Sequence, residues 1–140
     1  MLRMSAADLN RFLDNAFGGD RAYVVDDVDD QRLIARVRAD AVMLRPGGTV
    51  SGPTLMALAD SAAYCQILAH IGPVALAVTS SLNISFLRKP ERGDMIGEAT
   101  FLKLGRKLAV VDVRIRSEGS ADLVAQAVVT YAIPSPRPPS

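Results

Sequence analysis

The segment "SGPTLMALADSAAYCQILAHIG", residues 51–72, constrains the fold more than any other part of the chain. It predicts a helix over about residues 52–71, because Pro53 is tolerated in a first helical turn and Gly72-Pro73 ends the pattern. A helix that is apolar nearly all round has to be buried against other elements. Its apolar side chains include Leu55, Met56, Leu58, Ala59, Ala62, Ala63, Ile67 and Leu68. One carboxylate, Asp60, stands in the middle of this helix.

The segments around the central helix predict a sheet. Residues 21–28 and 31–40 are the first two expected strands, and residues 31–40 alternate apolar and polar side chains. Four further strands are expected at residues 74–87, 94–105, 107–117 and 121–132, with turn residues between them that favour antiparallel neighbours. The predicted class is α+β, a curved antiparallel sheet wrapped around one long helix.

The two ends of the chain complete the predicted organisation. Residues 5–17 read as an amphipathic helix with Ser5 as its N-cap. The side chains expected on its apolar face are Leu9, Phe12, Leu13 and Phe17. We expect a single domain over residues 1–133 and a disordered, proline-rich tail over residues 134–140.

Composition excludes several classes of function. The formal net charge of +1 on 140 residues gives no support to nucleic-acid or membrane-surface binding. With no apolar run long enough to span a bilayer, we expect a cytoplasmic protein. Cys65 is the only cysteine and His70 the only histidine, which argues against a disulfide, a zinc site and a Ser-His-Asp triad. We expect neither a metal nor a redox cofactor.

Two blocks of sequence resemble a known family. They are "GTVSGPTLMALADSAAY", residues 48–64, and "TSSLNISFLRKPERGD", residues 79–94. Both are similar to the hotdog fold, and within it to acyl-CoA thioesterases of the phenylacetic-acid-degradation type. The resemblance extends from about residue 20 to residue 132. It implies a hydrolase that cleaves a small, medium or aromatic acyl-CoA to the free acid and coenzyme A.

The resemblance assigns roles to residues of this chain. It makes Asp60 the general base or nucleophile, and it makes the backbone N–H of Gly52 the group that polarises the thioester carbonyl. Thr79 matches a hydroxyl residue that holds the attacking water in some members. Ser51 stands where the family commonly has histidine, and Arg45 falls near a position that is often asparagine. Ser51 is accordingly a candidate for a hydrogen bond to the carbonyl or the water.

The spacing of Gly52 and Asp60 implies more than one chain. The two residues are eight positions apart, about 12 Å along a helix at 1.5 Å per residue. One carbonyl cannot contact both from the same helix. In the resembling family the aspartate comes from the facing subunit, so the resemblance implies a homodimer with shared sites, or a tetramer of such dimers.

Coenzyme A carries phosphates, so basic residues at the rim of the sheet are candidates for binding it. The substrate-binding candidates are Arg45, Asn83, Arg88, Lys89 and Arg106. Most of the basic residues there are explained equally well as solvent-exposed side chains at the rim of the sheet, with no role in binding.

Two other functions stay open. The first is a hotdog protein that binds acyl-CoA without turnover, as a sensor or accessory subunit, which the replacement of the family histidine by Ser51 favours. The second is a dehydratase or hydratase of the same fold. Those enzymes pair a histidine with an acid, and His70 stands at the far end of the helix from the site.

Overall fold

The computed structural model describes residues 2–19, 21, 23–38, 44–45, 49–74 and 76–134. Its elements are α1 (Ala6–Phe17), β1 (Tyr23–Val28), β2 (Arg32–Val37), β3 (Leu44–Arg45), β4 (Thr49–Val50), α2 (Gly52–Ile71), β5 (Val78–Phe86), β6 (Met95–Leu104), β7 (Leu108–Ser117) and β8 (Leu123–Ala132). Six strands form one antiparallel sheet in the order β1-β2-β6-β7-β8-β5. The predicted α+β class is confirmed.

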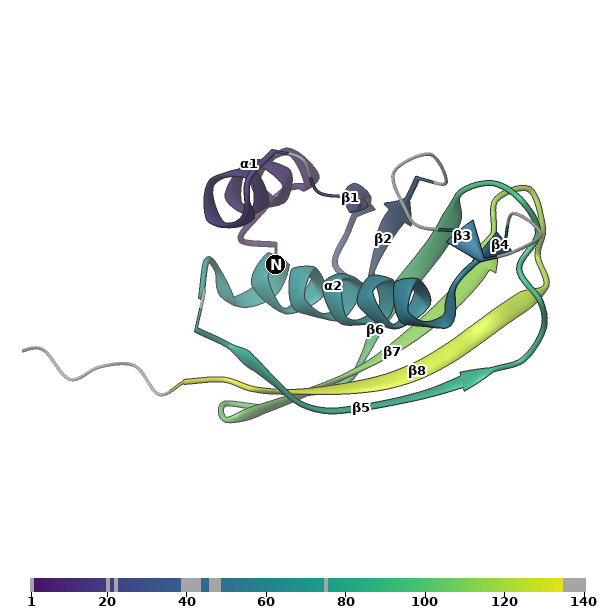
Figure 1. The fold of residues 1–140 in the computed structure, drawn as a ribbon. Helices are drawn as coiled ribbons and strands as arrows, with labels where there is room; N and C mark the ends of the chain where they lie inside the picture. The colour runs from purple at the N-terminus through teal and green to yellow at the C-terminus, as the bar shows by residue number, and fades with distance from the viewer. Residues whose placement is uncertain are drawn as a thin grey trace, which may run out of the picture.

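The sheet curves around α2, which lies along its concave face (Figure 1). Strands β2, β6 and β7 supply most of the packing against the helix. The approach is close at Gly97 on β6, where an added Cβ would lie 3.3 Å from Cγ of Leu58. A glycine at this position therefore lets the helix rest directly on the sheet.

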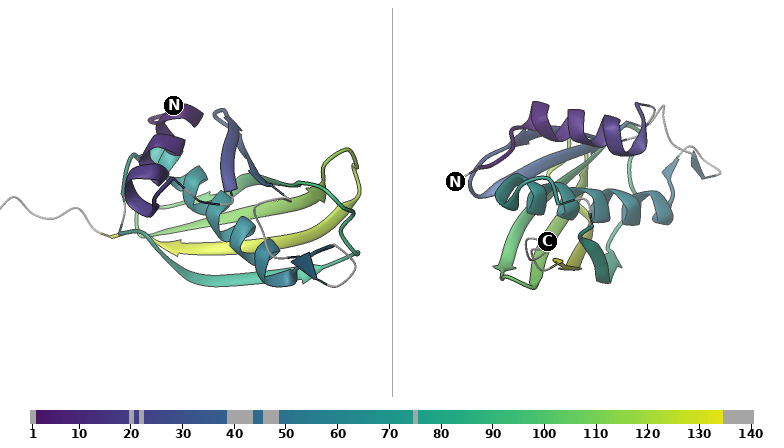
Figure 2. Two further views of the ribbon diagram at one scale, coloured as in Figure 1. Left: turned by 45° about the horizontal axis from the view of Figure 1, so that its top comes forward. Right: turned by 90° about the vertical axis from the view of Figure 1, so that its left-hand side faces the viewer.

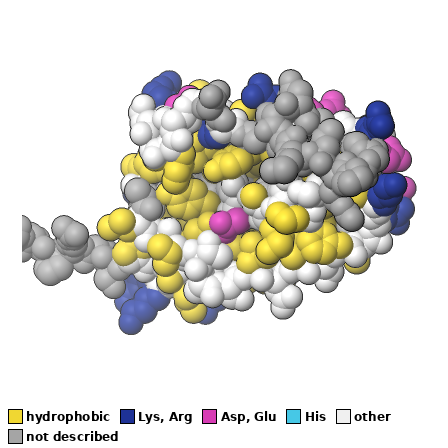
Figure 3. Space-filling model, viewed as in Figure 1, with side chains coloured by type: hydrophobic (Ala, Val, Ile, Leu, Met, Phe, Trp, Pro, Cys, Tyr) yellow, Lys and Arg dark blue, Asp and Glu magenta, His cyan; other side chains and the backbone are white. Residues whose placement is uncertain are grey.

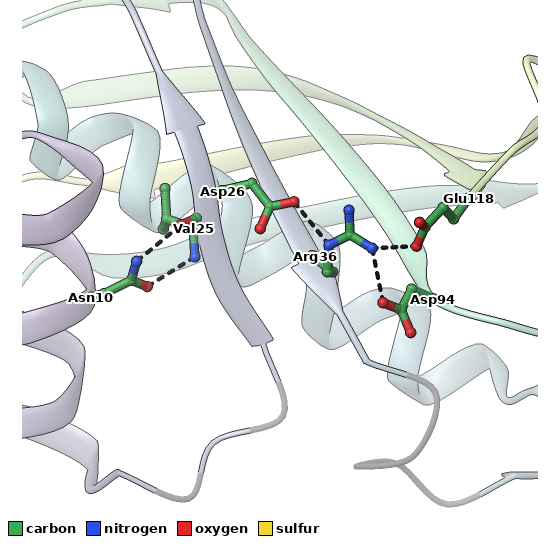
Figure 4. A network of polar contacts seen from close by, with 6 residues as sticks. All are labelled: Asn10, Val25, Asp26, Arg36, Asp94 and Glu118. Atoms are coloured by element: carbon green, nitrogen blue, oxygen red, sulfur yellow. Dashed lines mark hydrogen bonds and ion pairs between the residues drawn. The ribbon is translucent and has the colours of Figure 1, made fainter.

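The helix α1 begins at a capping box, in which the Ser5 side chain accepts from the N–H of Asp8 and the Asp8 side chain accepts from the N–H of Ser5. It packs beside β1, on the same side of the sheet as α2 (Figure 2). The Asn10 side chain bonds both the N–H and the carbonyl of Val25, each over 2.9 Å (Figure 4). This double contact fixes α1 to β1.

Three local predictions were wrong. Phe17 was expected on the buried face of α1, but its side chain is 62% exposed. Met56 was expected to be buried with the rest of the central helix, but it is 41% exposed because it lies with Pro53 and Ala57 on the exposed face of the first half of α2. The six expected strands include none between residues 40 and 52, but the structure has the short antiparallel pair of β3 and β4 there. Residues 135–140 of the predicted tail lie outside the described residues.

Candidate active site

The first half of the candidate site is the N-terminus of α2. Ser51 is the N-cap, and its Oγ accepts from the N–H of Thr54 and lies 2.9 Å from Oγ1 of Thr54. Gly52 is the first helical residue, so its N–H has no partner within the helix. Pro53 follows it and has no N–H. No partner for the Gly52 N–H is found among the described residues, while the Ser51 hydroxyl is already engaged as a cap.

The second half of the site is the carboxylate of Asp60, which is half-buried in the middle of α2. Its Oδ1 accepts from Oγ1 of Thr79 over 2.7 Å and from the hydroxyl of Tyr131 over 2.8 Å. The Tyr131 hydroxyl also lies 3.3 Å from the backbone carbonyl oxygen of Asp60. Two neutral donors from the sheet thus hold one oxygen of the acid.

Strand register brings these two donors together. Thr79 and Tyr131 pair directly across β5 and β8, so their side chains lie on the same face of the sheet. Burial, chiefly, and the charge of Asp60 raise the pKa of Tyr131, so its hydroxyl stays protonated and acts as a donor.

A pocket of about 330 Å³ opens beside the carboxylate. Its lining residues are Phe17, Tyr23, Asp60, Ser61, Tyr64, Ala77, Val78, Thr79 and Tyr131. The set includes all three tyrosines of the chain. The Tyr64 ring meets Phe17 edge-on at 6.4 Å and Tyr131 in a tilted contact at 5.8 Å. An acidic side chain stands in the middle of this face, among apolar and uncharged ones (Figure 3).

The structure brings only part of the expected set together. Thr79 contacts Asp60, whereas Gly52 and Ser51 lie at the N-terminus of α2 and do not line the pocket. A Cβ added at Gly52 would instead lie 3.5 Å from the ring of Phe86, at the far end of β5. Within one chain the Asp60 carboxylate and the Gly52 N–H therefore lie apart, as their spacing on the helix predicts.

The candidate phosphate ligands divide between the two ends of the sheet. Arg88 and Lys89 follow the end of β5 that is next to Gly52, and Arg88 bonds the carbonyl of Leu123 and pairs with Asp122. Arg106 lies in the turn before Leu108, at the opposite end. All three are exposed, as is Asn83 on the edge strand β5. The Arg45 side chain lies outside the described part of the structure.

Sequence reasoning missed Tyr131 as a site residue. The available signal was its hydroxyl at the inward-facing end of an alternating strand, because a buried tyrosine hydroxyl usually has a partner.

His70 lies in the last turn of α2 with its ring 5.1 Å from Phe101, and burial lowers its pKa. Within the described ranges no group of three or more His, Cys, Asp or Glu side chains could hold a metal ion. In the same ranges no helix is both long and apolar enough to cross a bilayer.

Comparison with known proteins agrees with this architecture. The sequence pattern of the thioesterase superfamily matches residues 47–124, which include both halves of the site. A provisionally assigned thioesterase from Silicibacter sp. TM1040 has a similar crystal structure, with a TM-score of 0.90 and 42% identity over 96% of this chain and 94% of that one. The chain therefore belongs to the thioesterase superfamily and is a thioester hydrolase of the hotdog fold.

Two further relatives agree with the assignment. A provisionally assigned thioesterase from Ralstonia eutropha JMP134, described as a phenylacetic acid degradation-related protein, is 31% identical over 84% of this chain and 89% of that one, with a TM-score of 0.72. A provisionally assigned esterase of Thermoplasma acidophilum is 28% identical over 91 residues, 65% of this chain and 67% of the relative. The predicted resemblance to hotdog thioesterases of the phenylacetic-acid-degradation type is confirmed.

Proposed function

We propose that the protein is an acyl-CoA thioesterase that releases a small, medium or aromatic acid and free coenzyme A. The observation that carries the proposal is the carboxylate of Asp60, which is held by Thr79 and Tyr131 at the edge of a pocket large enough for a compact acyl group. A cavity of about 150 Å³ already accommodates benzene, so 330 Å³ leaves room for a ring and a short linker.

The reaction needs an oxygen nucleophile and a group that polarises the carbonyl. In one route Asp60 takes a proton from water, the water oxygen bonds to the carbonyl carbon, and the C–S bond of the tetrahedral intermediate breaks. In the other route an oxygen of Asp60 bonds to that carbon itself, the thiolate leaves, and water then cleaves the mixed anhydride. A thiolate leaves readily, so both routes proceed without a strong general acid.

The Gly52 N–H is the proposed donor to the carbonyl oxygen, where negative charge develops. A free N–H at a helix N-terminus suits this role because the helix dipole favours negative charge there. Gly52 and Asp60 are about 12 Å apart along α2, so we assign each site one residue from each of two subunits.

The edge strand β5 supports such a dimer. Its nine residues contain no proline and no charged side chain, and among the described strands only β8 pairs with it. Val78, Phe86 and Leu87 on or next to it are each more than half exposed. An edge strand without charge or proline is a template for pairing with a second copy.

The substrate's phosphates are assigned to Arg88, Lys89 and Arg106, with Arg45 and Asn83 as further contacts. Within one chain the end of β5 that precedes Arg88 is next to the proposed Gly52 donor.

One observation favours the second candidate function, binding of acyl-CoA without turnover. The Ser51 hydroxyl, at the position of the family histidine, is occupied as a helix cap.

A panel of acyl-CoAs tests the proposal, from acetyl to long-chain and including phenylacetyl and benzoyl. Release of free coenzyme A is measured for the wild type and for Asp60→Asn, with folding and oligomeric state as controls. We expect turnover of at least one compact member and its loss in the variant. Binding of acyl-CoA by the wild type with no turnover of any member would overturn the enzyme proposal in favour of a binding protein.

A further inference from the structure

Tyr131 lies at the C-terminal end of β8 with only 4% of its surface exposed. Its ring packs against Tyr64, with 5.8 Å between the ring centroids. The hydroxyl is its only side-chain polar atom, and it meets both the side chain and the backbone carbonyl of Asp60. The phenol is therefore held in place by its ring contacts and its hydrogen bonds together.

Both donors to Asp60 bind the same oxygen. Thr79 and Tyr131 donate to Oδ1 over 2.7 and 2.8 Å, while Oδ2 accepts from none of the described residues. The terminal torsion of an aspartate is otherwise broad, so rotation of this carboxylate would cost two hydrogen bonds at once. Oδ1 is therefore held in place by two hydrogen bonds, while Oδ2 has none to the described residues.

We propose that Tyr131 is a positioning residue for thioester hydrolysis, which together with Thr79 holds Oδ1 so that Oδ2 faces the water or the thioester carbonyl. The inference rests on the proposed function. Oδ2 then accepts the proton of the attacking water, or it forms the bond to the carbonyl carbon in the covalent route. Fixing this atom matters because a reacting group displaced by about 1 Å can lose on the order of 100-fold in rate.

A purely structural role predicts different kinetics. If the hydroxyl of Tyr131 only satisfied its own burial, its removal would change stability or pocket shape and would act on KM. If it positions Oδ2, its removal acts on the chemical step and leaves substrate binding unchanged. The two roles also differ in whether the effect depends on the carboxylate of Asp60.

The first test compares Tyr131→Phe with the wild type on phenylacetyl-CoA, or on the panel member that turns over fastest. We expect kcat to fall by about 10- to 100-fold with KM changed by less than about twofold. Thr79→Val removes the other donor and should show the same division between kcat and KM. Thr130→Val is the control. Thr130 lies between Val129 and Tyr131 on β8, and both of these face the core. Its side chain therefore points to the opposite face of the sheet, away from the pocket.

The second test repeats Tyr131→Phe in the Asp60→Asn background and measures the residual rate. We expect no further loss beyond about twofold, since the positioned carboxylate is already absent. The inference is overturned by an equal loss in both backgrounds, by a change confined to KM, or by unchanged kcat in Tyr131→Phe. Absence of turnover by the wild type would overturn the proposed function itself, and full turnover by Asp60→Asn would overturn the role of Asp60. Inactive Asp60→Asn beside fully active Tyr131→Phe would overturn this inference alone.

Discussion

Gly52 and Asp60 lie on the same helix but at two separate positions. Gly52 lies beside the ring of Phe86, and the carboxylate of Asp60 lies at the pocket, bound by Thr79 and Tyr131. The Gly52 N–H and the Asp60 carboxylate of one chain therefore cannot contact the same thioester. A site that uses both takes them from two subunits, which makes subunit complementation possible.

Complementation gives the first prediction. Asp60→Asn and Gly52→Pro homodimers should each lose about 100- to 1000-fold in kcat, because one lacks the acid and the other the N–H. A purified heterodimer of the two variants contains one intact site and should recover about half of the wild-type rate per dimer. The measurement is release of free coenzyme A by differently tagged, co-expressed chains.

The Gly52 position offers a matched control. Ser51 has φ −76° and ψ 157°, which suits a residue before proline, so Gly52→Pro removes the N–H without opposing the backbone. Gly52→Ala keeps the N–H, and its Cβ would meet Phe86 at an ordinary 3.5 Å. We expect Gly52→Ala to stay active. A heterodimer as inactive as its parents would place both groups of each site in one chain.

Arg36 gives a prediction about stability. It pairs with Asp26 over 2.9 Å and with Asp94 over 2.8 Å, and it also pairs with Glu118, so one guanidinium joins β1 to the ends of β6 and β7 (Figure 4). Arg36→Met should lower the free energy of unfolding by about 2 kcal/mol, since three carboxylates lose a shared partner.

Denaturant unfolding of Arg36→Met at low and high salt measures this effect. The difference from the wild type should shrink at 1 M salt, where the Debye length is about 3 Å. Arg114→Met is the control, because Arg114 is 64% exposed and has one pairing at 3.4 Å. Equal losses in the two variants would contradict a special role for the Arg36 network.

Cys65 gives a chemical prediction. It is 1% exposed on α2, and burial raises the pKa of its thiol to about 12. The thiolate is the reactive form, so a thiol reagent at pH 8 should label no thiol in the native protein and one per chain after denaturation. Rapid labelling of the native protein would mean that α2 opens readily at this position.

Much of the fold is predictable because its local signals agree with each other. The helix over 52–71 follows from an apolar run between Ser51 and Gly72, and the structure has α2 over the same residues. The site is less predictable. Asp60 and Thr79 stand in two motifs that resemble a family, but Tyr131 is 71 residues from Asp60 and lies in neither motif.

The position of Tyr131 depends on register, which the sequence does not determine by itself. Thr79 pairs with Tyr131, and a bulge between Thr79 and Ser81 shifts the pairing of β5 with β8. A shift of one residue would turn either side chain to the opposite face of the sheet. The contact with Asp60 therefore depends on a bulge that local sequence signals do not specify.

Alkaline titration gives the last prediction. Burial, chiefly, raises the pKa of both Tyr64 and Tyr131, while an unfolded tyrosine ionises near pH 10. The folded state thus keeps protons that the unfolded state has lost, so the contribution of these two tyrosines to the free energy of unfolding should be constant below about pH 10 and fall as pH rises further. Besides Tyr64, the groups that act on Tyr131 are Asp60, Thr79 and Cys65.

Absorbance at 295 nm should show less tyrosinate at pH 11 in the native protein than in the unfolded one, and the difference should shrink in Tyr131→Phe. Identical native and unfolded titrations would mean that neither tyrosine hydroxyl is buried in solution.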